Sequence, residues 1–152
     1  MKNILIVYAS IHKNNTKKIA EQMADVLQAD LVSVQKLTKE DLLRADIIGF
    51  GSGIYFGKFH KGLINKIEEL TEVEGKKAFI FSTSGMRKNF IINHSHKHFK
   101  GVLEKKGFEV VGDFNCLGHD ENGPLKYIGG VNKGRPNEDD LAEARRFAEK
   151  VL

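Results

Sequence analysis

The stretch that decides the fold of this chain is NILIVYA, from Asn3 to Ala9. It is an almost continuous apolar run rich in β-branched residues, which is typical of a strand buried on both faces of a parallel sheet. The run is too short for a membrane span or for the apolar core of a secretory signal. Polar residues follow from Ser10 to Asn15, and Thr16 then begins a segment whose apolar residues recur every three or four positions. We therefore predict a strand, a loop and a helix that packs on the sheet.

The same alternation continues along the chain. Further strands are predicted at residues 30–34, 45–53, 77–82 and 108–114. Further helices are predicted at residues 61–70, at residues 93–106 with Gly107 as a left-handed cap, and after Asn137, which caps the last one. The series predicts one α/β domain over residues 1–152, a three-layer, doubly wound fold with a five-stranded parallel sheet in the order 2-1-3-4-5. Ligands of such folds bind beyond the carboxyl ends of the strands, so the loops after the first, third and fourth strands form the candidate site.

Composition and charge restrict the class of protein. The 152 residues include 24 Lys and Arg against 20 Asp and Glu, a formal net charge of +4, and 41% are hydrophobic. These values fit a globular protein and exclude a disordered, collagen-like or coiled-coil chain. The single cysteine, Cys116, cannot form an internal disulfide and suits buried packing. A cytoplasmic location without a membrane span is the expectation.

Positive charge is concentrated between Gly75 and Leu103, where there are basic residues but no Asp or Glu. The basic residues are Lys76, Lys77, Arg87, Lys88, Lys97 and Lys100. We expect a local basic face, which is either a solvated surface or a surface that attracts an anion or an acidic partner. The stretch lacks a ladder of aromatic residues interleaved with the basic ones, so a nucleic-acid partner is not expected. The same stretch contains His94, His96 and His98, which we expect to be solvated. His94 and His98 have the spacing of metal ligands but no evident third ligand, so no metal is expected.

The loop after the first strand has donors for an anion. Ser10, His12, Asn15 and Thr16 stand before or at the start of a helix, where unpaired backbone N–H groups and the helix dipole favour a dianion. The alternative is a plain helix cap with Asn15 at the N-cap. The loop has neither the GxGxxG nor the GxxxxGK[ST] pattern, which argues against a nucleoside triphosphate.

Four segments together resemble the flavodoxin family. The run YASIHKNNTKKIAEQMA is similar to the phosphate loop of flavodoxins, FGSGIYFGKFHKGL to the second flavin loop, and FSTSGM to the third. The stretch GGVNKGRPNEDDL resembles the family's carboxyl-terminal signature, so the resemblance covers nearly the whole chain. One departure is Asn14, which stands where the family usually has Gly. Asn tolerates positive φ, so we expect the turn to survive.

The resemblance implies FMN as the cofactor. It implies that Ser10, His12, Asn15 and Thr16 hold the phosphate. It further implies that the flavin ring is bound by Ser52, Gly53, Ile54, Tyr55, Gly57, Phe59, Thr83, Ser84, Gly85 and Met86. Tyr55 is the best wall for the ring, whereas Phe59 and Met86 have core packing as their alternative. The Gly57 peptide is expected to reorient when the flavin is reduced, the alternative being a turn glycine without a redox role.

The resulting functional hypothesis is an FMN-binding electron-transfer protein that serves a redox partner protein or a small-molecule electron acceptor. One alternative is a small FMN-dependent NAD(P)H:quinone or porphyrinogen oxidoreductase, in which residues 117–136 form a substrate pocket. Another is a module of the same fold that binds no cofactor. A phosphoacceptor receiver is disfavoured, because Tyr8-Ala9-Ser10 and Gly51-Ser52-Gly53 stand where acidic residues would be needed. Arg87 and Lys88, next to the third loop, are expected to make full reduction of the flavin easier; the alternative is that both point into solvent, where salt screens their charges.

Overall fold

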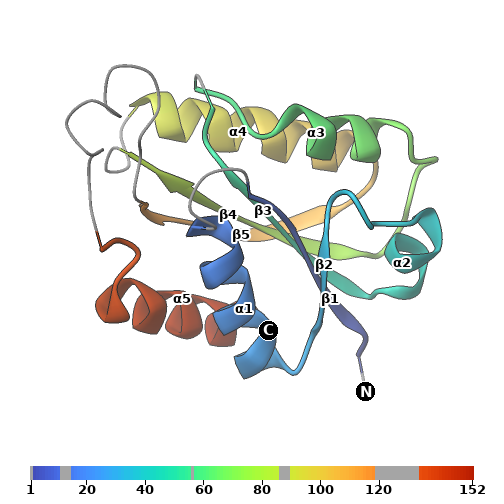
Figure 1. Cartoon of the computed structure of the whole chain (residues 1–152). Coiled ribbons are helices and arrows are strands. Elements are labelled where there is room, and N and C mark those ends of the chain that lie inside the picture. Colours follow the sequence, from blue (N-terminus) through green and yellow to red (C-terminus); the bar gives the residue numbers. More distant parts are fainter. Residues whose placement is uncertain (1, 11–14, 56, 86–89, 119–133) are drawn as a thin grey trace.

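The computed structural model describes residues 2–10, 15–55, 57–85, 90–118 and 134–152. Its five strands form one parallel sheet in the order β2-β1-β3-β4-β5 (Figure 1). The strands are β1 (Ile4–Ala9), β2 (Asp30–Ser33), β3 (Ile47–Gly53), β4 (Lys77–Ser84) and β5 (Glu109–Leu117). The predicted fold class and strand order are confirmed.

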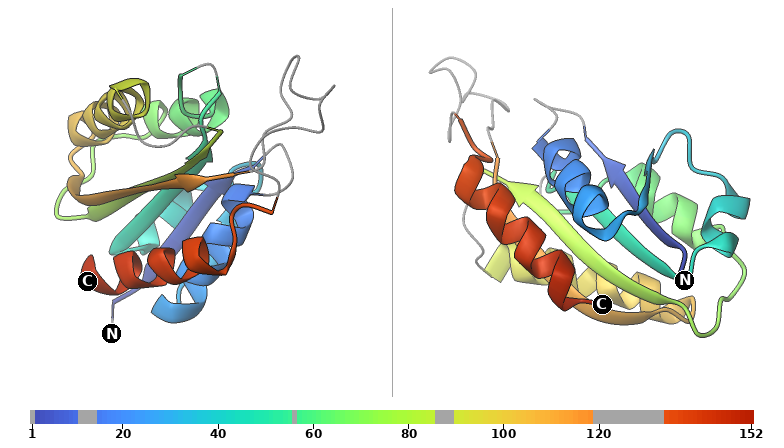
Figure 2. Two further views of the ribbon diagram at one scale, coloured as in Figure 1. Left: turned by 90° about the vertical axis from the view of Figure 1, so that its left-hand side faces the viewer. Right: turned by 90° about the horizontal axis from the view of Figure 1, so that it is seen from below.

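Helices cover both faces of the sheet, as Figures 1 and 2 show. One face is covered by α1 (Asn15–Leu27) and α5 (Glu138–Lys150), and the other by α2 (Lys39–Arg44), α3 (Lys61–Glu68) and α4 (Phe90–Lys105). The sequence patterns did not predict α2. This helix has six residues, and its only buried side chain is Leu42, so it carries no apolar periodicity. A capping box fixes it instead: the Thr38 side chain accepts from the Asp41 amide at 3.1 Å, and the Asp41 carboxylate accepts from the Thr38 amide at 3.0 Å.

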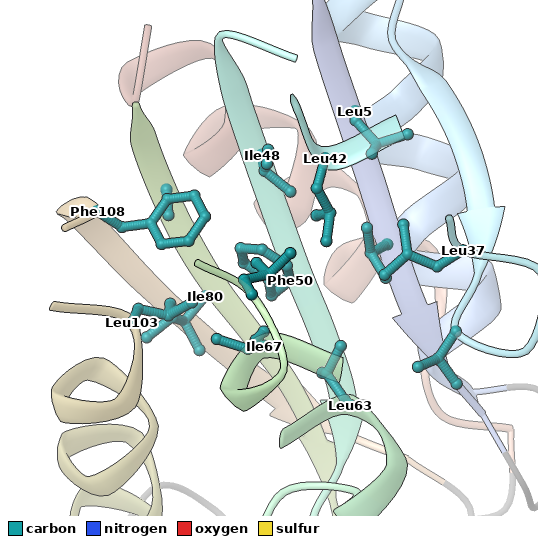
Figure 3. Close-up of a cluster of buried hydrophobic side chains, with 14 of the residues drawn as sticks. Leu5, Leu37, Leu42, Ile48, Phe50, Leu63, Ile67, Ile80, Leu103 and Phe108 are labelled. Atoms are coloured by element: carbon teal, nitrogen blue, oxygen red, sulfur yellow. The ribbon is translucent and has the colours of Figure 1, made fainter. Parts of the chain in front are cut away.

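Apolar side chains form one core on each face of the sheet. Figure 3 shows the larger core, in which strand residues such as Ile48, Phe50 and Ile80 meet Leu63 of α3 and Leu103 of α4. The core on the opposite face joins the sheet to α1 and α5. Burial of these side chains provides the main stabilisation of the sheet that carries the candidate site.

The carboxyl ends of β4 and β5 extend further than predicted. We expected β4 to end at Ser82 with a turn after it, but Thr83 and Ser84 pair with Cys116 and Leu117 of β5. These additional pairs make the third loop start later and fix the Thr83 and Ser84 backbone within the sheet. Cys116 is buried, and this burial raises the pKa of its thiol to about 12, which agrees with a packing role.

The predicted single basic face is wrong for the described residues. The Lys76 ammonium donates to the carbonyl groups of Leu43 (2.8 Å) and Ala45 (2.5 Å) and so holds the end of α2. Lys77 lies at the start of β4 and lines a hollow together with Val151, next to α5. Lys97 and Lys100 instead belong to α4, across the sheet. Arg87 and Lys88 lie outside the described residues.

No helix within the described ranges is long and apolar enough to cross a membrane.

The Gly107 backbone has φ +99°, which confirms the predicted left-handed cap at the end of α4.

Candidate functional site

The candidate site lies at the carboxyl ends of β1, β3 and β4. Strand order reverses between β1 and β3, because the chain crosses from β1 to β2 on one side and continues from β3 to β5 on the other. Ala9 pairs with Ser52, and Gly53 pairs with Thr83. These pairs place the three predicted loops beside one another at the switch point where doubly wound folds bind ligands.

The start of α1 carries two buried polar residues. Asn15 is the first residue of α1, and Thr16, which follows it, is only 1% exposed. The Thr16 and Thr83 hydroxyl groups lie 2.9 Å apart and form a hydrogen bond. Thr83 was assigned to the flavin ring, but its side chain lies beside α1. The first and third loops are therefore tied together at their bases.

The Asn15 side chain packs close to the end of β5. A Cβ atom on Gly118 would lie 2.7 Å from Asn15 Nδ2, so only a glycine allows this approach. The Gly118 amide donates to the Ser84 carbonyl at 2.9 Å. The segment after β5 thereby helps to position Asn15. Ser10, the remaining described residue of the predicted phosphate group, follows β1 and is half-buried. His12 lies outside the described residues.

The second loop begins with a tight turn. The Tyr55 amide donates to the Lys58 carbonyl at 2.8 Å, and the Lys58 amide donates back to the Tyr55 carbonyl at 3.1 Å. Gly57, inside this turn, has φ +75°, a conformation that favours glycine. Its carbonyl accepts from the buried Ser95 hydroxyl of α4. The turn is thus anchored to α4 at the peptide that was predicted to reorient.

The Tyr55 ring lies against the end of β3. A Cβ on Gly53 would be 2.7 Å from the Tyr55 hydroxyl oxygen, so the glycine leaves room for the ring. Tyr55 and Ile54 are both half-buried. The Ile54 amide donates to the Thr83 carbonyl at 3.0 Å, which holds the beginning of the loop beside β4. Tyr55 and Ile54 therefore present partly exposed apolar surface at the switch point.

Two residues of the predicted ring site support the loop from inside. Phe59 is 4% exposed and stacks on Phe99, with ring centroids 4.5 Å apart. This is the core packing that was its alternative role. Ser52 is buried, accepts from the His60 amide at 2.8 Å and donates to the Gly53 carbonyl at 2.5 Å. Both residues fix the path of the second loop.

The third loop begins at the end of β4. Ser84 is buried, and its hydroxyl accepts from the Asn115 amide nitrogen at 3.1 Å. Gly85 follows it and is half-buried. Met86 lies outside the described residues, as do Arg87 and Lys88. The Ser84 hydroxyl is therefore positioned by β5, a contact that the sequence did not indicate.

The prediction that the three histidines are solvated is wrong for His96, which is 4% exposed. The helix begins at Phe90 rather than near Asn93, and His96 lies on the same stripe as the buried Ile92 and Phe99. Spacing from Ile92 to His96, Phe99 and Leu103 could have revealed this burial. His94 and His98 are exposed, as predicted. Within the part of the chain that the structure describes, no group of three acidic, histidine or cysteine residues could hold a metal ion.

His60 provides a pH-dependent helix cap beside the site. Its Nδ1 atom accepts from the Gly62 amide at 3.0 Å at the start of α3, and burial lowers the pKa of the imidazole. Protonation would remove the acceptor. The stabilisation by this cap is therefore complete above the unfolded pKa of about 6.5 and is lost as the pH falls through the lower folded pKa.

We predict that His60→Asn, which keeps a capping oxygen without an imidazole, makes stability less dependent on pH between about 5 and 7. Urea unfolding midpoints of both proteins across this range provide the measurement. A constant difference between the two midpoints at every pH would contradict the role of His60 protonation.

Comparisons with known proteins agree with this architecture. Residues 5–117 match the family model described as a flavodoxin domain. A protein from Methanocaldococcus jannaschii whose function is uncharacterized is 45% identical over 148 residues, which cover 97% of each chain. A short-chain flavodoxin associated with a non-canonical PDU bacterial microcompartment has a TM-score of 0.76 at 18% identity, over 99% of this chain and 97% of its own. Oxidised flavodoxin 2 from Bacillus cereus has a TM-score of 0.74 at 22% identity, over 98% and 97%. The chain belongs to the flavodoxin family.

Proposed function

We propose that this protein binds FMN at the carboxyl ends of β1, β3 and β4 and transfers electrons through it. The observation that carries the proposal is the hydrogen bond between Thr16 and Thr83, which joins the predicted phosphate loop to the predicted third flavin loop. The half-buried Tyr55 belongs to the predicted second flavin loop and lies against Gly53 at the end of β3. In the proposed site, the residues for the phosphate and those for the ring would lie side by side at the switch point.

The donor set at the start of α1 suits a phosphate. Ser10, Asn15 and Thr16 supply hydroxyl and amide groups next to backbone N–H groups that a helix leaves unpaired at its first turn. The positive end of the helix dipole favours a dianion in the same place. These residues would hold the phosphate of FMN, with the Thr83 hydroxyl orienting that of Thr16.

The second and third loops suit a flat ring with one polar edge. Tyr55 and Ile54 offer apolar surface, Gly53 allows close approach of the backbone, and the backbone of Ser84 and Gly85 provides polar groups along the edge. The bound flavin would supply the redox chemistry, while the protein orients it and shields it from water. Phe59 and Ser52 would stabilise the loop without touching the ring.

We predict that Tyr55→Ala increases the fluorescence of bound FMN and shifts its midpoint potentials, because the stacked wall is lost. Tyr55→Phe keeps the ring and serves as the control, with emission close to that of the wild type. Emission spectra and redox titrations of the three loaded proteins provide the measurement. Unchanged emission and potentials in Tyr55→Ala would exclude Tyr55 as a wall of the site.

Kinetics with NAD(P)H distinguish an electron carrier from an oxidoreductase. As a carrier, the photoreduced FMN-loaded protein is expected to reduce an added one-electron acceptor in a single turnover. The same protein is expected to show no steady oxidation of NADH or NADPH when a quinone is supplied. Sustained NAD(P)H oxidation would instead support the small oxidoreductase, and lack of reaction with any acceptor would contradict electron transfer.

A further inference from the structure

Five polar side chains form a hydrogen-bonded chain beneath the third loop. Asp113 Oδ2 lies 2.8 Å from His96 Nδ1, and His96 Nε2 lies 2.6 Å from the Ser82 hydroxyl oxygen. The Asn115 amide nitrogen lies 2.8 Å from the same hydroxyl oxygen and 3.1 Å from the hydroxyl of Ser84. This hydrogen-bonded network runs from the sheet edge at β5, through α4 and β4, to the predicted third flavin loop. The FMN site proposed above assigns no role to its first four members.

The donors and acceptors define the protonation state of the imidazole. Asn115 Nδ2 also lies 3.4 Å from the Ser82 carbonyl, so this nitrogen is a donor and Ser82 Oγ accepts from it. Within the described ranges, the Ser82 hydroxyl proton has no acceptor other than His96 Nε2. These hydrogen bonds are all satisfied when Nε2 lacks a proton and accepts from Ser82, with Nδ1–H donating to the Asp113 carboxylate. The arrangement therefore favours a neutral His96 with its proton on Nδ1.

His96 can nevertheless exchange protons with solvent. It lines a cavity of about 470 Å³ between α4 and β5, together with Asp113, Lys97 and Lys100. The Asp113 side chain is 41% exposed, whereas that of His96 is 5% exposed. Asp113 favours the protonated imidazole, and the two lysines oppose it. On its inner side the imidazole contacts the edge of the Phe59 ring, with ring centroids 5.3 Å apart, and the neutral Ser82. Charges of both signs thus face the group from the cavity.

We propose that His96 is a positioning residue that couples proton binding in this cavity to the redox state of the flavin. This inference rests on the proposed FMN site. In the proposed step, His96 Nε2 takes up one proton from solvent, and the imidazole is neither oxidised nor reduced. Reduction adds negative charge to the flavin and so raises the proton affinity of His96. By linkage, the protonated His96 makes reduction easier to the same extent.

Hydrogen-bond rearrangement carries the coupling beyond the imidazole. A protonated Nε2 would become a donor to Ser82 Oγ, which already accepts from Asn115 and would lose the acceptor for its own proton. Relief of this conflict requires Ser82 or Asn115 to turn. Movement of Asn115 would change its hydrogen bond to Ser84, at the edge of the third loop. No proton has to pass through the Asn115 amide.

Nuclear magnetic resonance of ¹⁵N-labelled protein tests the proposal. FMN binding is first verified by absorbance, and the ring nitrogens of His96 are then titrated between about pH 5 and 9 in the oxidised and the dithionite-reduced protein. The expected result is a proton affinity of His96 that is about twofold or more higher after reduction. Equal titration midpoints in both states, or an imidazole that stays neutral throughout in both, would overturn the coupling. The exposed His98 of α4 serves as the internal control and should shift less.

Two matched variants add a functional readout. His96→Gln can bridge Ser82 and Asp113 without titrating, and it should flatten the dependence of the flavin midpoint potential on pH, whereas His98→Gln should leave it as in the wild type. Identical curves for His96→Gln and the wild type would contradict the proposal. If FMN does not bind, the proposed function and this inference both fail. Bound FMN together with an unchanged His96 titration defeats this inference alone.

Discussion

Thr16→Ala is expected to weaken FMN binding by about 1–3 kcal/mol, roughly 5- to 150-fold, the range for losing a charge-assisted hydrogen bond. Thr16 is buried at the start of α1 and is held by the Thr83 hydroxyl at 2.9 Å. The proposed phosphate contact therefore needs little reordering when FMN binds. Riboflavin has no phosphate, so its affinity should change little. Fluorescence titrations of both ligands with both proteins provide the measurement.

Thr16→Ser is the matched control, because it keeps the hydroxyl and removes only a methyl group. It should bind FMN nearly as the wild type does. Equal losses of affinity for FMN and riboflavin in Thr16→Ala would place Thr16 away from the phosphate, and unchanged affinity for FMN would do the same.

Gly107→Ala should destabilise the fold by about 2–4 kcal/mol, the sum of a left-handed backbone penalty and a forced backbone shift. Gly107 has φ +99°, and a Cβ there would overlap the backbone carbonyl of Val73. That carbonyl belongs to a chain segment fixed by the bond from the Val73 amide to the Lys106 carbonyl at 2.7 Å. Neither backbone can move away easily. Chemical denaturation gives the free energy of unfolding of each protein.

Gly101→Ala, within the helix that Gly107 terminates, is the control with the opposite expected effect. Gly101 lies inside α4, and a Cβ there would meet no atom within 4 Å. This variant should stabilise the protein by about 0.5–1 kcal/mol through helix propensity. If Gly107→Ala had the same denaturation midpoint as the wild type, the steric explanation for glycine between α4 and β5 would be contradicted.

Apolar periodicity was sufficient to predict the sheet and four of its helices. The run from Asn3 to Ala9 predicted β1 because its residues are buried on both faces, and such a pattern depends on local sequence alone. The helix α2 has one buried residue, Leu42, and therefore no pattern to detect. The end of β4 consists of polar residues from Ser82 to Ser84, and β5 contains Asn115 near its end; such residues are typical of loops. Pairing between the strands overrides that local preference.

The network around His96 depends on a register that no local pattern reveals. The pairing of β4 with β5 shifts by one residue between Ala78 and Phe79, so that Ser82 pairs with Asn115. Without this irregularity Ser82 would pair with Phe114, and the amide of Asn115 would point to the opposite face of the sheet. The sequence indicated the polar and aromatic residues of the three predicted flavin loops, whereas the polar contacts beneath these loops follow from tertiary structure.

Binding of FMN to this chain is tested most directly by titrating the purified protein with FMN and following the visible absorbance of the flavin. We predict a perturbed flavin spectrum that saturates at one FMN per chain, with weaker binding of riboflavin. A spectrum identical to that of free FMN throughout the titration, with all FMN passing a filter that retains the protein, would contradict it.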